Sequence, residues 1–178
     1  CALALTMGAN TGFAQSGETG LKDAYKDYFS IGVAVNMRNI SNPEQIAIIK
    51  KDFNSITAEN DMKPQPTEPA YGQFNWENAD KIANFCRSNG IKLRGHCLMW
   101  HAQIGEWMYK DEKGDLVSKE KLFQNMKHHI TAIVERYKDV IYAWDVVNEA
   151  ISDGGWQGGR RGMGEHPSPY RNSPLYQI

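Results

Sequence analysis

The sequence lacks the short motifs that mark most cofactor and nucleophile sites. Its 178 residues contain no Gly-x-Gly-x-x-Gly or P-loop pattern, no His-Glu-x-x-His or Cys-x-x-Cys pair and no Gly-x-Ser-x-Gly elbow. These absences argue against nucleotide binding, a zinc site and a serine hydrolase. Neither sign of charge is in excess, with 20 Lys and Arg against 21 Asp and Glu. Because there is no long-range field to attract polyanions, we expect no nucleic-acid partner.

Long hydrophobic runs are also missing, so we expect no membrane span. The one apolar stretch of note is Cys1–Gln15, which is rich in small residues and gives way to a polar segment. We interpret residues 1–15 as a signal-peptide remnant, which predicts a secreted, cell-surface or periplasmic protein. A frayed N-terminal strand is the alternative. A lipidated Cys1 is less favoured, because the apolar run follows the cysteine instead of preceding it.

Cysteine is scarce, and the three residues present form no metal-binding spacing. Cys1 falls in the presumed signal, Cys86 in a helical pattern and Cys97 in a strand-like run. Two buried free thiols are the simplest expectation. A disulfide would be compatible with export, but this spacing cannot establish one.

Short apolar runs alternate with helical patterns along the chain. The runs are residues 29–35, 55–58, 91–100 and 140–147. This order predicts an α/β fold with parallel strands and right-handed crossovers. A doubly wound sheet and a (β/α)8 barrel both fit, although the missing phosphate loop weakens the nucleotide-binding version of the former.

Helix boundaries can be predicted from capping residues. Ser41 and Glu44 match a capping box around Pro43, Asn75 can cap a helix over residues 76–88, and Gly90 can end it. A further helix should begin after Ser118. Its expected buried face is Leu122, Met126, Ile130, Ile133, Val134 and Tyr137.

Polar side chains gather where the predicted strands end, which is where barrels place their catalytic groups. They are Asn36; Glu59, Asn60, Asp61 and Lys63; His96, Trp100, His101 and Gln103; and Asn148 and Glu149. Glu149 stands out, because a carboxylate directly after an apolar strand is costly to bury without a role.

Each of the other strand-end residues has a plainer reading. Asn36 can be a turn residue, Glu59 and Lys63 can form a surface ion pair, and His96 can be a core histidine with one hydrogen bond. For the adjacent His128 and His129, we expect side chains on different sides of a helix that cannot face one ion. We therefore predict no metal site.

Three stretches carry a resemblance to a known family: TAENDMKPQPTEPAYGQFNW (57–76), LRGHCLMWHAQ (93–103) and WDVVNEA (144–150). In this order they resemble the N-terminal half of family 10 glycoside hydrolases, which are typically endo-1,4-β-xylanases. The likeness runs from Leu21 to Ile178. It implies a (β/α)8 TIM barrel of which only strands 1–4 and about three helices are present, with residues 16–178 as the N-terminal part of the catalytic domain.

The resemblance also assigns roles by position. Glu149 matches the general acid/base, and Asn148 matches the residue that binds the sugar 2-OH at the cleavage site. His96 and Trp100 match contacts to that same sugar, and His101 resembles a supporting residue near the acid/base. The residues that match contacts to the non-reducing-side sugars are Glu59, Asn60, Lys63 and Gln103. The implied substrate is xylan, with no metal or organic cofactor and a monomeric full-length enzyme.

A retaining mechanism needs two carboxyl groups. A general acid must also keep its proton near neutral pH, which the apolar neighbours Val146, Val147 and Ala150 would favour at Glu149. The family's nucleophile follows strand seven, so we expect it to be missing here. Neither Glu59 nor Glu165 is expected to replace it. This piece alone should then be inactive, expose apolar surface and fold poorly. The alternatives are a barrel glycosidase of other specificity, such as a β-1,4-glucanase, and a non-catalytic xylan-binding protein that uses Trp100 and Trp107.

Overall fold

The computed structural model describes residues 19–152 and 169–178. The expected signal segment and Glu165 lie outside these residues. The strands are β1 (Gly32–Val35), β2 (Ser55–Ala58), β3 (Lys92–Trp100) and β4 (Ile141–Asn148). The helices are α1 (Leu21–Ala24), η1 (Asn39–Ser41), α2 (Pro43–Asp52), α3 (Pro64–Thr67), α4 (Glu77–Asn89), η2 (Glu106–Met108), α5 (Lys119–Tyr137) and α6 (Pro174–Gln177).

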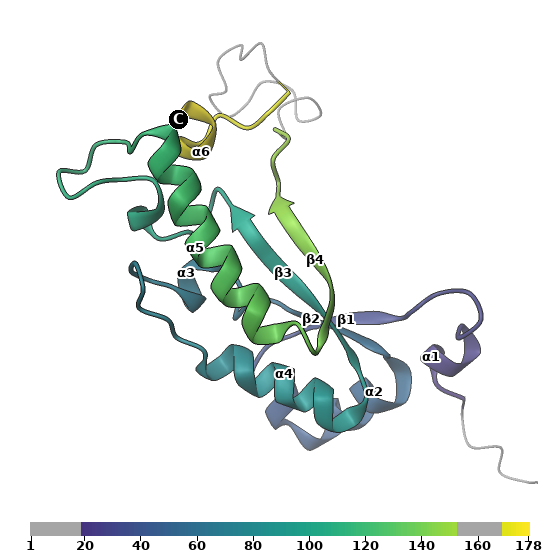
Figure 1. The fold of residues 1–178 in the computed structure, drawn as a ribbon. Coiled ribbons are helices and arrows are strands. Elements are labelled where there is room, and N and C mark those ends of the chain that lie inside the picture. The colour runs from purple at the N-terminus through teal and green to yellow at the C-terminus, as the bar shows by residue number, and fades with distance from the viewer. Residues whose placement is uncertain (1–18, 153–168) are drawn as a thin grey trace, which may run out of the picture.

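The four strands form one parallel sheet in the order β1-β2-β3-β4 (Figure 1). Each strand pairs with the one before it in sequence, so the strand order does not reverse as it does in a doubly wound sheet. This sequential order distinguishes between the two architectures that the sequence left open, because it is the order of a barrel wall. The parallel α/β fold is confirmed.

One face of the sheet packs against the helices. Ile56 and Leu93 are fully buried there together with Ile82, Ala83 and Ile133. The strand side chains alternate, so the opposite face carries polar groups such as Arg94, His96 and Asp145. The fold therefore separates an apolar core from a polar face at which a site can form.

Two helix starts differ from the predictions. Asn42, not Ser41, caps α2, because its side chain accepts hydrogen bonds from the N–H groups of Glu44 and Gln45. The Ser41 hydroxyl, at the end of η1, instead donates to the carbonyl of Met37, which precedes η1. Trp76 occupies the N-cap position of α4, although the Asn75 side chain accepts from the Glu77 N–H over 3.4 Å.

The other capping predictions are confirmed. Gly90 ends α4 in the left-handed region with φ 62°, and Ser118 caps α5 by accepting from the N–H of Lys121. Leu122, Ile133 and Tyr137 are buried on the expected face of α5. Asn125 and His129, which the apolar pattern did not mark, are buried there as well.

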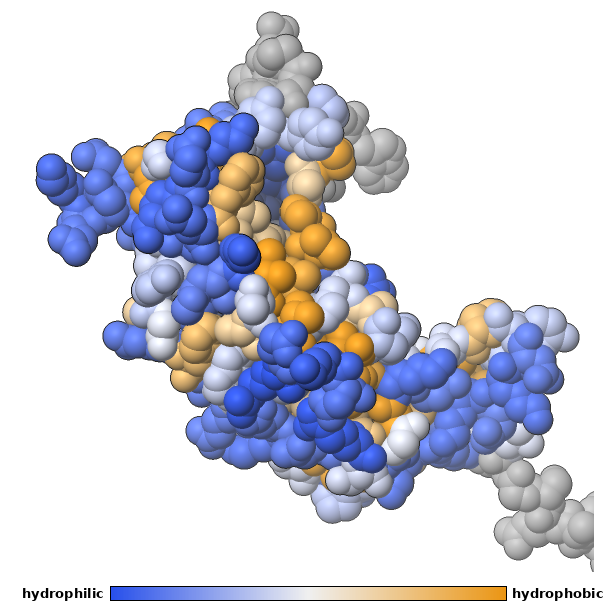
Figure 2. Space-filling view, viewed as in Figure 1, coloured by the Kyte–Doolittle hydropathy of each residue, from blue (hydrophilic) through white to orange (hydrophobic). Residues whose placement is uncertain are grey.

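The surface over β4 is unusually apolar. Figure 2 shows a hydrophobic band beside α5, and Val146 and Val147 on β4 are 58% and 56% exposed. Exposed strands of this kind favour association between chains. The expectation that this stretch folds poorly by itself remains a prediction. A cooperative melt of a soluble 178-residue monomer would contradict it.

Both thiols of the described chain are free and buried, as predicted for Cys86 and Cys97. Burial raises the pKa of Cys97 to about 11, so this thiol stays protonated beside the polar face of the sheet. Among the helices that the structure describes, none is long and apolar enough to span a bilayer.

Candidate active site

Glu149 lies directly after β4, where the chain leaves the sheet. Its backbone has a φ of 51°, the left-handed region that non-glycine residues adopt at a cost of about 1–2 kcal/mol. Arg171 stabilises this turn, since its Nε donates to the Glu149 carbonyl over 3.1 Å. Its backbone N–H also donates to the Ala150 carbonyl over 2.8 Å. Arg171 was not predicted, because nothing in the local sequence links it to Glu149.

The Glu149 carboxylate meets the end of β3. Trp100 is the register partner of Asn148, and its indole Nε1 donates to Glu149 Oε2 over 3.0 Å. His101 Nε2 lies 3.9 Å from the same oxygen. The structure therefore brings together four residues that the sequence had placed at two different strand ends.

The expected apolar surroundings of Glu149 are not formed by the described residues. The Glu149 side chain is 47% exposed, and Val146 and Val147 present their side chains to solvent. The reason is that these two valines belong to the exposed band on β4 and do not pack around the carboxylate. Sequence adjacency to apolar residues was therefore a poor guide to the surroundings of this group.

His96 is held by a group that the sequence reasoning missed. Its Nδ1 donates to Asp145 Oδ2 over 2.9 Å, and Arg94 binds the other oxygen of the same carboxylate. Burial raises the pKa of Asp145, but the hydrogen bonds from His96 and Arg94 outweigh it, so the net shift is below the ordinary value. Asp145 is thus an anion that orients the His96 ring. The feature that links Asp145 to the site is the register of β3 and β4, in which His96 and Asp145 are partners.

The residues after β2 contact those after β1 and β3. Asn36 donates from Nδ2 to Glu59 Oε2 over 2.9 Å, and its Oδ1 also accepts from the Arg38 N–H, so it serves both as a turn residue and as a neighbour of the site. Lys63 is buried, donates to Asn60 Oδ1 over 2.8 Å and lies 4.6 Å from the centroid of the Trp100 ring. The ion pair considered for Lys63 and Glu59 is thus replaced by contacts to Asn60 and Trp100.

Gln103 lies at the edge of this group and has a positive φ of 39°. Its carbonyl accepts from the N–H of Gln65, which ties the segment after β3 to α3. The resulting arrangement follows four parallel strands and contains carboxylates, amides, an imidazole, a buried ammonium group and an indole ring. In the part of the chain that the structure describes, no group of three His, Cys, Asp or Glu side chains could hold a metal ion.

His128 and His129 share a partner that the sequence did not indicate. Although they are adjacent on α5, both rings reach the buried carboxylate of Glu68. His128 Nε2 lies 3.1 Å from Oε1, and His129 Nδ1 lies 2.9 Å from Oε2. The two oxygens of one carboxylate are far enough apart to meet neighbouring side chains that leave the helix in different directions.

Parallel strands in sequential order, with an acid, amides and an aromatic ring at their carboxyl ends, place the chain in the class of barrel enzymes, which build their active sites at this edge. The sequence model that describes the family "Glycosyl hydrolase family 10" matches residues 20–178 of this chain. The chain belongs to this family, and its four parallel strands form part of the family's TIM-barrel-like fold.

Known relatives agree with this assignment. An endo-1,4-beta-xylanase/feruloyl esterase of Xylanibacter ruminicola is 57% identical over 161 residues, which are 86% of this chain and 22% of that protein. An endo-1,4-beta-xylanase A of a Caldicellulosiruptor species is 46% identical, over 89% of this chain and 22% of that protein.

Solved structures of family 10 xylanases are also similar to this chain. A psychrophilic family 10 endo-beta-1,4-xylanase is 67% identical, with a TM-score of 0.81 over 90% of this chain and 47% of that one. A mutant solved in complex with xylotriose has a TM-score of 0.79 at 36% identity, over 89% of this chain and 44% of that one. The chain therefore spans less than half the length of these relatives.

Proposed function

We propose that this chain is the N-terminal part of the catalytic domain of a retaining endo-1,4-β-xylanase, with Glu149 as the general acid/base. The observation that carries the proposal is the position of Glu149, which is strained, half exposed and directed to the end of β3, where it meets Trp100. Strain at an exposed polar residue is typical of functional sites, because a merely structural surface residue gains nothing from it.

In this mechanism Glu149 protonates the leaving glycosidic oxygen and later removes a proton from the attacking water. The indole N–H of Trp100 occupies Oε2, which leaves Oε1 as the oxygen that carries the transferable proton. The nucleophile is supplied by a carboxylate of the full-length enzyme outside residues 1–178.

The neighbouring residues bind the sugars. Asn148 and His96 contact the sugar at the cleavage site, and the anionic Asp145 keeps His96 in the orientation that this contact needs. Lys63, Glu59, Asn60 and Gln103 contact the sugars on the non-reducing side. Trp100 offers a ring face, while the buried Lys63 ammonium group is held in place by Asn60.

The full-length Glu149→Ala enzyme tests the assignment. Loss of a general acid slows substrates with poor leaving groups most, because an activated aryl leaving group departs without protonation. We therefore expect activity on xylan to fall much further than activity on a dinitrophenyl xyloside. Equal losses on both substrates would contradict the acid role. Hydrolysis of cellulose in preference to xylan by the wild-type enzyme would favour a β-1,4-glucanase instead.

We also propose that the enzyme is exported, on the basis of the apolar, small-residue segment of residues 1–15. N-terminal sequencing of the protein from the producing cells is the test. A mature chain that begins shortly after Gln15 is expected. A cytoplasmic protein that retains Cys1–Gln15 would contradict the proposal.

A further inference from the structure

A cavity of about 640 Å3 lies outside the sheet, between α5 and the segment that precedes it. Its aromatic lining is Tyr71 and Trp107, and Asn125 of α5 contributes a polar group. The segment 109–117 lies on one side of α5, whereas β4 and its carboxyl end lie on the other (Figure 1). The cavity is therefore separate from the site around Glu149.

Contacts with neighbouring side chains and backbone hold the two aromatic rings in position. The Trp107 indole donates from Nε1 to the Glu68 carbonyl over 2.9 Å. Tyr71 stacks on His128 with ring centroids 4.5 Å apart, and meets Trp107 edge to face at 5.4 Å. Tyr71 is nevertheless 54% exposed, and Lys121 Nζ lies over its ring at 5.4 Å from the centroid, so a ligand that stacks on this side of the ring would displace the ammonium group.

A fully buried carboxylate supports this arrangement. Glu68 has no exposed surface, and it accepts hydrogen bonds from His128, from His129 and from the Gly72 N–H. Each of its partners belongs to the wall of the cavity or adjoins it. An ionisable group is costly to bury, and this one fixes the His128 ring on which Tyr71 stacks.

Asn125 provides a second, independent observation that points to a polar ligand at this cavity. Its side chain is 2% exposed and donates from Nδ2 to the carbonyls of Trp107 and Met108. Its Oδ1 is buried and has no hydrogen-bond partner among residues 19–152 and 169–178. A buried acceptor without a donor is destabilising, and a ligand hydroxyl or its bound water would satisfy it.

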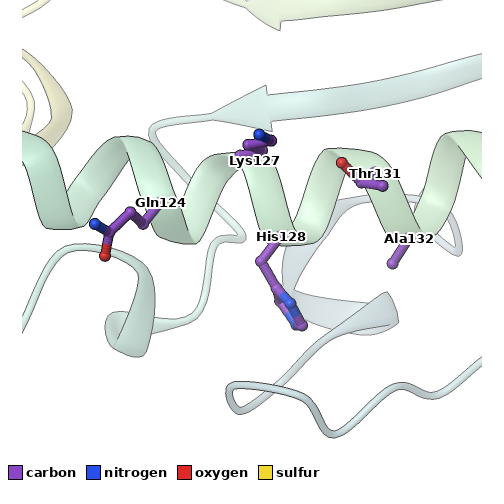
Figure 3. A pocket seen from close by; sticks show the side chains of 5 residues that line it. All are labelled: Gln124, Lys127, His128, Thr131 and Ala132. Atoms are coloured by element: carbon purple, nitrogen blue, oxygen red, sulfur yellow. The ribbon is translucent and has the colours of Figure 1, made fainter.

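The hollow continues along α5. A shallower cavity of about 440 Å3 is lined by Gln124, Lys127, His128, Thr131 and Ala132, and Figure 3 shows His128 pointing away from the strand drawn above the helix. The Tyr71–His128 stack joins the two cavities, because each ring lines one of them. From Lys121 to Ala132 the helix rises about 16 Å, so the surface is elongated and suits a chain molecule.

The charges on this surface nearly cancel. Four lysines line the two cavities, Lys110, Lys113, Lys121 and Lys127. The carboxylates opposing them are Asp111, Glu112 and Glu106, the last of which pairs with Lys110 at 2.6 Å. A neutral ligand with many hydroxyl groups fits such a lining, since it can stack on the rings and exchange hydrogen bonds with both signs of charge.

We propose that this surface is a second, non-catalytic binding site for a xylan chain, with Tyr71 and Trp107 as its stacking platform. The choice of xylan rests on the proposed function, whereas the site itself rests on the cavity and its fixed rings. The surface would hold one part of a polymer while another part lies in the cleft at Glu149.

The test is Tyr71→Ala in the full-length enzyme, with Tyr28→Ala as the matched control, because Tyr28 is an 80% exposed tyrosine near α1. We expect Tyr71→Ala to lower retention on insoluble xylan by about three- to tenfold, and Tyr71→Phe to restore it, because the ring makes the contact. The ratio of activity on insoluble xylan to activity on a short soluble xyloside should fall by a similar factor. Tyr28→Ala should alter neither quantity.

The outcomes separate this inference from the proposed function. Hydrolysis of xylan with retention that does not depend on Tyr71 overturns the second site alone. Retention that depends on Tyr71 in an enzyme that does not hydrolyse xylan supports the second site and contradicts the proposed activity. A Tyr71→Ala variant that loses activity on the insoluble and the soluble substrate to the same extent would show that Tyr71 is structural, which also overturns the site.

Discussion

Glu68 is fully buried and accepts hydrogen bonds from three donors, whereas the side chain of Glu149 is half exposed and lies on a strained backbone. The donors to Glu68 come from its own loop and from α5. Glu149 accepts from the Trp100 indole at Oε2, and its side chain is 47% exposed. The same side-chain type thus serves two purposes within one chain.

The difference shows how to read a carboxylate in this fold. A group whose hydrogen bonds are all supplied by the protein stabilises the fold, because removing it leaves buried donors unpaired. A group kept in a costly backbone conformation with an oxygen available is suited to act on a ligand. Glu68 should therefore control stability, and Glu149 should control activity.

The largest effect should come from Glu149→Gln in the full-length enzyme. Because the amide cannot donate or accept the catalytic proton, kcat/KM on xylan should fall about 10²- to 10⁴-fold. The free energy of unfolding should change by less than about 0.5 kcal/mol, as for other surface substitutions. A marked loss of stability in urea would contradict the contrast with Glu68.

Glu68→Gln should instead lower the stability of the fold. The amide oxygen can still accept from one histidine, but the NH2 group leaves the other without an acceptor, and we expect a loss of about 2–4 kcal/mol in the free energy of unfolding. Urea denaturation measures it. Glu77→Gln is the control, since Glu77 is an exposed glutamate paired with Lys81 and should change stability little. Equal stability of the two variants would show that the Glu68 network is not structural.

Asp145→Asn should lower activity by less than Glu149→Gln does. The amide can still accept from one partner, but it cannot hold both His96 and Arg94 as the anion does. We expect kcat/KM to fall about ten- to a hundredfold through a misplaced His96. Asp139→Asn is the control, because Asp139 also pairs with an arginine, Arg87, but lies away from the site. Equal activity of the two variants would contradict a positioning role for Asp145.

The smallest effect concerns pH. Burial lowers the pKa of His129 below its ordinary value of 6.5, and the bond to Glu68 only partly opposes this. The unfolded chain then binds more protons than the folded one as the pH falls below 6.5, so stability should decrease in that direction. His129→Gln should flatten this slope in urea titrations between pH 7 and 5. An unchanged slope would show that another group titrates there.

Much of the fold could be predicted because its signals are local. The four apolar runs matched strands to within about three residues at each end, and Gly90 and Ser118 ended and began helices as expected. The α2 cap was missed because Asn42 and Ser41 are both good capping residues, and only the backbone conformation selects between them. The proximity of Glu149, Trp100 and His101 could also be predicted, because each follows or ends a strand and parallel strands end at one edge of the sheet.

The remaining features are contacts between distant residues. Asp145 and His96 are 49 positions apart, and Glu68 and His129 are 61 positions apart. Neither pair follows a motif, because hydrogen bonds across the fold impose no spacing along the chain. The apolar surroundings expected for Glu149 failed for the same reason, since neighbours in sequence need not be neighbours in space.

The sequence by itself determined the alternation of strands and helices, the polar residues at the strand ends and the family to which they point, all of which depend on local periodicity and motifs. The tertiary structure alone decided which carboxylate is buried, which one is strained and available, and which aromatic rings are fixed on the surface. Burial, register and hydrogen-bond partners arise only when distant segments pack together.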